Sequence, residues 1–116
     1  MPAGIYNITI EKGATFQRVL TWKDATGALV DLSTYTARAM GRANDYTGAL
    51  LFSLTSASGL TLGGVAGTIT MVISATATSG MTPGTNGVWD LEMISGAGVV
   101  TRLVQGKIEV SPEVTY

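Results

Sequence analysis

Asp90 and Glu92 are the two carboxylates whose spacing most resembles a catalytic pair, because they stand two residues apart in a run of alternating apolar and polar residues. Such alternation places both side chains on the outward face of a strand. A glycoside hydrolase needs one carboxyl with a raised pKa in an apolar pocket and a second carboxyl about 5–10 Å away. Arg102 is expected opposite Glu92 across a hairpin, so we interpret the two carboxylates as members of solvated cross-strand ion pairs.

The other residues that could support chemistry lie in turns. Three aspartates are in or beside predicted turns, where calcium ligands often occur: Asp24, Asp31 and Asp45. None has the ligand spacing of an EF-hand loop, so we expect them to cap the backbone. Ser58 and Ser79 have no histidine to activate them, and the glycines of residues 63–67 precede a strand without a following lysine, as in a hairpin turn rather than a phosphate loop. We therefore predict no catalytic, cofactor-binding or metal-binding residue, and no cofactor.

The amino-acid composition excludes several further classes of function. The chain has 116 residues, no cysteine, no histidine and a formal net charge of −1, which excludes disulfides, thiol nucleophiles and histidine acid–base pairs. Arg18, Arg38, Arg42 and Arg102 are separated by neutral or acidic residues, so we expect neither nucleic acid nor a membrane as partner. Only 13% of the residues are charged, against about 25% in a typical soluble domain. Because charged residues are depleted from interface cores, this surface is typical of a protein covered in an assembly.

We expect no targeting signal in the amino terminus and no membrane-spanning segment in the most apolar run. Residues 1–7 lack a basic region followed by an apolar stretch, so we predict no secretory signal. The most apolar run, residues 65–77, is interrupted by hydroxyl side chains and is shorter than the roughly 20 residues of a membrane-spanning helix. We therefore expect a soluble protein made in a cytosol.

Period-two alternation dominates the chain and predicts about eight or nine short strands in one all-β domain over residues 1–116. The expected strands include residues 6–10, 15–23, 35–42, 50–54, 60–62, 67–73, 88–94 and 107–110. Arg18 falls on the apolar face of its run, which indicates a bulge or a strand end. Ser74 is placed to cap a single helical turn. Strand order is not written in the alternation, so a sandwich and a jelly roll both stay open.

The last hairpin can be put in register. If residues 96–98 form a three-residue loop, Leu91 lies opposite Leu103 and Glu92 opposite Arg102. Gly106 then marks a bulge or a bend. Both tryptophans, Trp22 and Trp89, are expected on inward faces, and tryptophans exposed on one open face with Tyr46 would instead favour a carbohydrate-binding module.

Five segments in order along the chain carry a family resemblance: ITIEKGATF (8–16), TWKDATG (21–27), VDLSTYTAR (30–38), GVWDLE (87–92) and RLVQGKIEVSPEVT (102–115). Together they resemble small virion proteins of tailed bacteriophages and are similar to the Ig-like amino-terminal domain of phage baseplate upper proteins. The resemblance implies an Ig-like antiparallel β-sandwich and a structural role, with no functional residue to carry over.

That role is the expected function: a non-enzymatic component of a tailed phage particle, in its tail, baseplate or fibre-attachment region. Its expected partners are other virion proteins and further copies of itself in a homo-oligomer or symmetric assembly. Its expected location is the virion, assembled in the cytoplasm of the bacterial host. The alternatives are a capsid decoration or head–tail junction protein and, from another class, a carbohydrate-binding β-sandwich.

Overall fold

Short alternating segments separated by glycine- and aspartate-containing turns form nine strands in the computed structural model, which describes residues 4–113. The strands are β1 (Gly4–Ile5), β2 (Ile8–Glu11), β3 (Phe16–Thr21), β4 (Thr36–Ala43), β5 (Leu50–Thr55), β6 (Leu60–Leu62), β7 (Thr68–Ile73), β8 (Asn86–Ile94) and β9 (Val100–Ser111). A 3₁₀ turn (Gly64–Ala66) and a short helix, α1 (Ala75–Ser79), are the helical elements of these residues. The predicted all-β class and strand number are confirmed.

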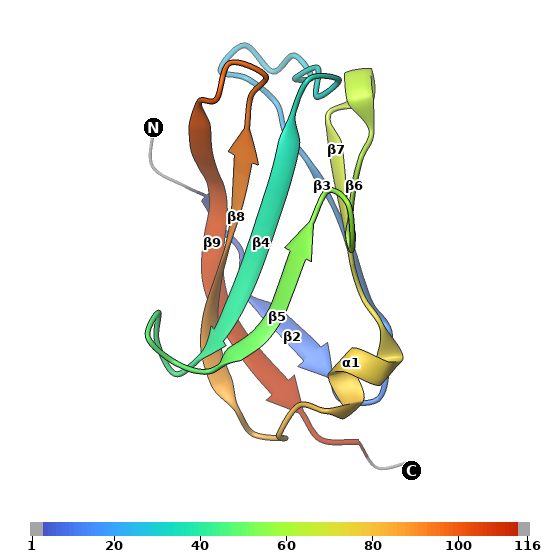
Figure 1. Cartoon of the computed structure of the whole chain (residues 1–116), viewed down its shortest axis with the longest axis vertical. Helices are drawn as coiled ribbons and strands as arrows, with labels where there is room; N and C mark the ends of the chain where they lie inside the picture. The colour runs from blue at the N-terminus through green and yellow to red at the C-terminus, as the bar shows by residue number, and fades with distance from the viewer. Residues whose placement is uncertain (1–3, 114–116) are drawn as a thin grey trace.

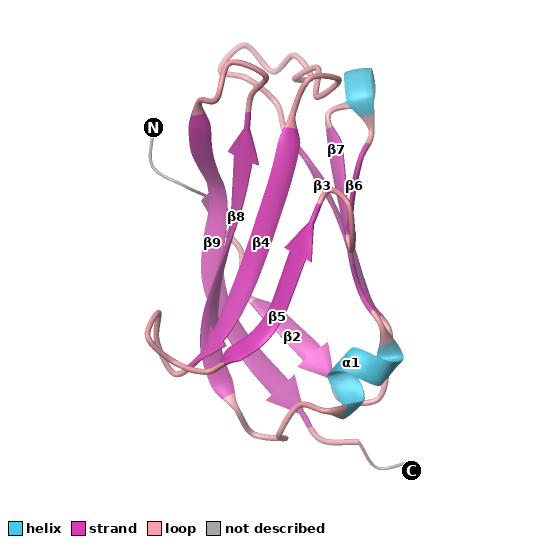
Figure 2. Cartoon of the chain, in the orientation of Figure 1, coloured by secondary structure: helices cyan, strands magenta, loops and turns pink. Residues whose placement is uncertain are grey.

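The strands form two sheets that pack face to face (Figures 1 and 2). The larger sheet has the order β1-β9-β8-β4-β5, with β2 also paired to β9, and the smaller sheet has the order β3-β7-β6. Most neighbours are antiparallel, as expected, whereas β1 and β2 run parallel to β9. No helix of residues 4–113 is long and apolar enough to cross a membrane.

The inward faces of the two sheets make one core. On β8 the side chains of Trp89, Leu91 and Met93 are buried, as the alternation predicts, whereas Asp90 and Glu92 point outward. Ser74 accepts a hydrogen bond from the Ala77 amide and caps α1, also as predicted. The remaining core is supplied by both sheets and by Leu32 between β3 and β4, and the sheet residues include Ile10, Phe16, Ala39, Phe52, Ile69, Met71, Ile108 and Val110.

The β8–β9 hairpin follows the predicted register only in part. The Ser95 amide donates to the Val99 carbonyl, so residues 96–98 form the predicted three-residue loop, and Glu92 lies opposite Arg102. The register shifts between Leu91 and Glu92, so Leu91 lies opposite Val104 rather than the predicted Leu103. One extra residue on β9 produces this shift, which is a β-bulge. The strand then continues without interruption through the position where a bulge or bend at Gly106 was expected.

Two predictions on the smaller sheet also need correction. Arg18 is neither at a bulge nor at a strand end, because β3 pairs with β7 in continuous register. Since β3 is an edge strand, the Arg18 side chain can leave the core, and its guanidinium lies 4.7 Å from the centroid of the Phe16 ring. Trp22 is half-buried rather than buried, and its ring meets that of Tyr35 edge to face at the margin of the core.

Candidate functional site

The outer face of the larger sheet brings together charged side chains from three strands. Because β8 lies between β4 and β9, the register places the outward residues in three rows across the sheet. These rows are Arg38–Glu92–Arg102, Met40–Asp90–Gln105 and Arg42–Val88–Lys107. A groove of about 770 Å³ lies over this face, lined by residues of all three rows and by Ile5, Asn7 and Tyr46. We call it the outer groove.

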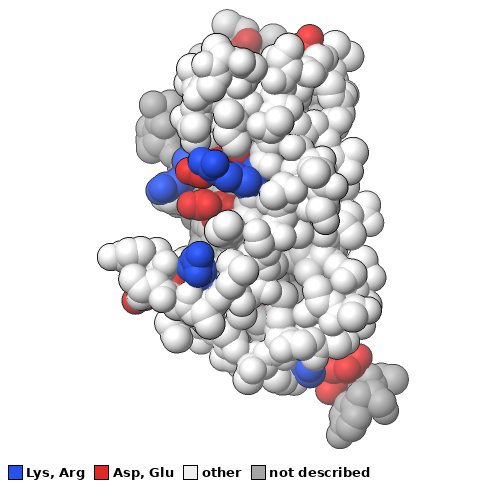
Figure 3. All heavy atoms as spheres, in the orientation of Figure 1, with Lys and Arg blue, Asp and Glu red and all other residues white. Residues whose placement is uncertain are grey.

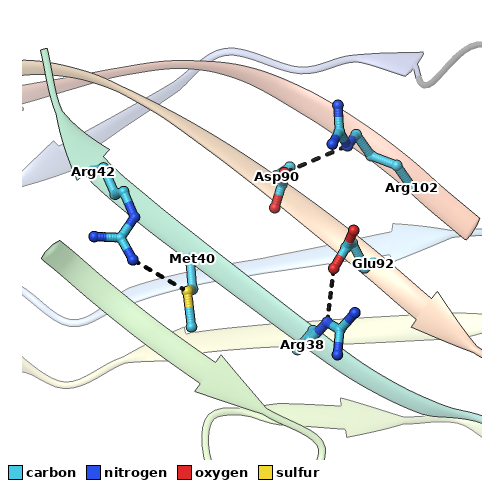
Figure 4. A network of polar contacts seen from close by, with 6 residues as sticks. All are labelled: Arg38, Met40, Arg42, Asp90, Glu92 and Arg102. Atoms are coloured by element: carbon cyan, nitrogen blue, oxygen red, sulfur yellow. Dashed lines mark hydrogen bonds and ion pairs between the residues drawn. The ribbon is translucent and has the colours of Figure 1, made fainter. Parts of the chain in front are cut away.

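Both candidate carboxylates take part in ion pairs on this face (Figure 4). Arg38 Nε donates to Glu92 Oε1 at 2.7 Å, and Arg102 Nε lies 3.4 Å from Asp90 Oδ2. The register partner of Glu92 is therefore Arg102, as expected, but its ionic partner is Arg38 on the opposite neighbouring strand. Arg102 reaches Asp90 along the diagonal, which long side chains on adjacent strands can do. Each pair is half-exposed and contributes about 0.2–1 kcal/mol.

Asp90 is the one carboxylate of the face with a raised pKa. Burial raises the pKa of the Asp90 carboxyl, and the negative charge of Glu92 raises it further, while Arg102 and Arg38 oppose the rise. A raised pKa is one property of a general acid. The guanidinium beside Asp90 nevertheless gives this carboxylate the environment of a surface ion pair, with 38% of its side chain exposed.

The third row holds two cations without a nearby carboxylate. Arg42 and Lys107 flank Val88, and among residues 4–113 no carboxylate oxygen lies within 4.0 Å of either cation. One Arg42 nitrogen donates to the Gly48 carbonyl at 3.2 Å, and the other terminal nitrogen lies 4.0 Å from the Met40 sulfur (Figure 4). Most of the five N–H donors of this guanidinium therefore stay available to a further acceptor.

The turn between β4 and β5 contributes Tyr46 to the lining of the outer groove. In Figure 1 this turn swings out from the sheet on the side of β8 and β9. Tyr46 at its tip is 82% exposed. Asp45 Oδ1 accepts hydrogen bonds from the Thr47 amide (2.9 Å) and hydroxyl (2.6 Å), and these bonds lower the pKa of the Asp45 carboxyl. The turn thus presents an ionised carboxylate next to an exposed aromatic ring.

The other candidate residues from the sequence do not line the outer groove. Asp24 accepts from Thr26 and Ala28, and Asp31 accepts from Ser33, so the predicted capping role of the turn aspartates is confirmed. The predicted hairpin turn at residues 63–67 is confirmed by the bond from the Gly63 amide to the Thr68 carbonyl. Within residues 4–113 no three acidic side chains gather where they could hold a metal ion.

Charge is unevenly distributed over the molecule (Figure 3). The three rows hold four cations and two carboxylates, a net charge of +2, out of the 15 charged residues of the chain. The other nine charged residues are three cations and six carboxylates, a net charge of −3. Sequence reasoning judged the arginines scattered because they are scattered along the chain. The pairing of β4 with β8, some fifty residues apart, brings Arg38 and Arg42 onto the same face as Arg102, and no local pattern encodes that pairing.

The sequence matches no protein-family model and no curated protein. Among solved structures, the fold is similar to the extracellular domain of the voltage-gated sodium channel beta4 subunit, with 12% identity, 98% of this chain and 97% of that chain covered, and a TM-score of 0.51. That domain is described as forming parallel homodimers that explain a role in cell–cell adhesion. Murine CRIg is also similar, with 10% identity, 92% of each chain covered and a TM-score of 0.43. The predicted Ig-like β-sandwich is confirmed at the level of the fold.

Proposed function

We propose that the chain is a non-enzymatic structural component of a tailed bacteriophage particle, in its tail, baseplate or fibre-attachment region, and that it works by protein–protein assembly. The observation that carries the assembly role is the outer groove, where five of the 15 charged residues gather beside the exposed Tyr46. Arginine, methionine and aromatic side chains are enriched in protein interfaces, and the outer groove is lined by Arg42, Met40 and Tyr46. The phage assignment is supported by the five segments that resemble baseplate upper proteins.

The test of this proposal is the composition of purified phage particles. We expect mass spectrometry of particles from a host that produces this chain to detect it in stoichiometric amounts. Gold-labelled antibodies against the chain should then bind at the tail or baseplate in electron micrographs. Labelling of the head would favour the alternative of a decoration or head–tail junction protein. Absence of the chain from the particles would overturn the proposal.

Carbohydrate binding loses its main support in this structure. Stacking on a sugar would require several aromatic rings on one open face. Trp89 is only 3% exposed, and Trp22 packs against Tyr35 at the margin of the core. Tyr46 is thus left without a tryptophan beside it on the outer face, and we favour the assembly role.

A further inference from the structure

The outer groove contains two cations, Arg42 and Lys107, that have no carboxylate oxygen of residues 4–113 within 4.0 Å. Arg42 and Lys107 lie on the two strands that flank Val88, so their Cα atoms are about 10 Å apart, twice the spacing of neighbouring strands. Both side chains are long enough to converge above Val88. In the row Arg38–Glu92–Arg102 a carboxylate occupies the central position, whereas in this row a valine does. A carboxylate bound above Val88 would therefore give this row the same order of cation, carboxylate and cation.

The same face presents a matching group. Asp45 and Tyr46 belong to the turn between β4 and β5, which swings out from the sheet (Figure 1), and Tyr46 lines the groove. The hydrogen bonds that Asp45 accepts within the turn use Oδ1. In the same chain, Asp45 lies beyond 4.0 Å from the Arg42 and Lys107 nitrogens. The Asp45 carboxylate is thus not paired with the two cations of its own groove, and the Tyr46 ring beside it lines the groove while 82% of the residue is exposed.

We propose that this turn of one copy docks into the outer groove of a second copy, with the Asp45 carboxylate between Arg42 and Lys107 and the Tyr46 ring over Val88. The proposal rests on the assembly role proposed above and identifies the surface and the partner. The turn and the groove lie on one face of the molecule. Two copies related by a two-fold axis can therefore make the turn–groove contact twice, as an isologous interface requires. Charge-assisted hydrogen bonds to a guanidinium and an ammonium would set the register of the pair.

Two features favour a second copy as the occupant. The turn carries the Asp45 carboxylate and the groove carries Arg42 and Lys107, so the turn of one copy and the groove of another are complementary in charge. The Tyr46 ring is 82% exposed and Met40 is 41% exposed, and both would lose water in the same contact. The uncharged outer edge of β5 offers a competing mode, in which two copies pair by backbone hydrogen bonds. That mode would not depend on Asp45 or on the two cations.

Charge reversal followed by mixing tests the contact. The variants are Asp45→Lys and the double variant Arg42→Glu/Lys107→Glu, and their self-association is measured by sedimentation equilibrium at low salt. Each variant alone brings like charges together in both halves of the pair, so we expect at least about a tenfold weaker association. An equal mixture brings opposite charges together in both halves, so association should return to the level of the unmodified protein. The matched controls are Asp31→Lys and Arg18→Glu, outside the groove, which should leave association unchanged.

Arg42 also donates to the Gly48 carbonyl, so its reversal can weaken the turn itself. Lys107→Glu alone, at an exposed position without a side-chain hydrogen bond in the described residues, therefore serves as the second groove variant, and circular dichroism checks the fold of each variant. The proposal is overturned if the unmodified protein stays monomeric, if the Asp45 and Lys107 reversals leave association intact, or if the mixture fails to restore it. Presence of the chain in particles is measured independently, so a monomer found in the particle would overturn this contact and leave the assembly role standing.

Discussion

The indole Nε1 of Trp89 donates a hydrogen bond of 2.8 Å to the backbone carbonyl of Tyr6, and the two rings meet edge to face with centroids 6.3 Å apart. This bond connects β8, in the middle of the larger sheet, to the segment where the chain passes from β1 to β2. The Tyr6 amide in turn donates to the Gln105 carbonyl on β9. Trp89 therefore holds the parallel amino-terminal strands against the same sheet that carries the outer groove.

Trp89→Phe should lower the free energy of unfolding by about 2–3 kcal/mol, because it leaves the Tyr6 carbonyl without its donor and opens a cavity beside it. The measurement is urea unfolding followed by circular dichroism. Trp22→Phe is the matched control, since Trp22 is half-buried at the margin of the core, and it should cost less than half as much. Equal losses in the two variants would mean that the bond to Tyr6 contributes nothing measurable.

Gly106→Ala should destabilise the same junction from the other side. Gly106 lies opposite Trp89 on β9, and a Cβ there would overlap the carbonyl group of Tyr6, which is backbone and cannot rotate away. This overlap should push β1 and β2 away from β9. We expect the free energy of unfolding to fall by about 1–3 kcal/mol, which is the range for overpacked sites. Gly80→Ala is the control, because its Cβ would meet only the Ala77 carbonyl, at 3.6 Å. Unfolding midpoints that move equally in the two variants would contradict this explanation.

The inward and outward faces of β4 and β8 were predictable, because one face of each strand is buried and its residues are apolar at every second position. Ala37 and Ala39 face the core and Arg38 faces outward, as the pattern of small and charged residues requires. The bulge on β9 was not predictable, because Leu103 and Val104 are both apolar and either could face inward. The close approach of Tyr6 explains Gly106, and it depends on a contact about a hundred residues apart in sequence.

The outer groove was predictable only in its β8–β9 half. The hairpin loop determines that Glu92 and Arg102 lie side by side, since two strands joined by three residues must pair. The β4–β8 half depends on which strand pairs with the other edge of β8. The alternation of apolar and polar residues does not identify that strand, because any neighbouring strand would be compatible with it. The row Arg42–Val88–Lys107 combines both halves, so its two cations could be associated only once the sheet order was known.

Thr78→Val should destabilise the end of the sandwich near α1. Thr78 is fully buried, its hydroxyl donates to the Ala14 carbonyl at 2.8 Å, and it accepts from the Gly13 amide at 3.1 Å. Valine keeps the shape and leaves both backbone groups without this partner, so we expect a loss of about 1–3 kcal/mol. Thr76→Val on the exposed side of the same helix is the control and should change stability by less than about 0.5 kcal/mol. A similar effect of both variants would indicate helix propensity rather than the buried bonds.

The stability of the protein relative to its Asp90→Asn variant should fall as pH rises. Burial raises the pKa of Asp90 above that of an exposed aspartate, so the folded state binds this proton more tightly than the unfolded chain. The carboxyl therefore adds stability below its unfolded pKa and loses that contribution as pH rises through the folded pKa. Asparagine imitates the protonated form at every pH.

Urea unfolding of both proteins between about pH 3 and pH 6 measures this difference. Hydrogen bonds lower the pKa of Asp24, Asp31 and Asp45, and their contribution has the opposite sign, present above the unfolded pKa and lost as pH falls. All three are present in both proteins, so their effect cancels when the two curves are subtracted. What remains belongs to Asp90 and its pairing with Arg102. A difference that stays constant or rises with pH would show that the ion pair, rather than burial, dominates the environment of this carboxyl.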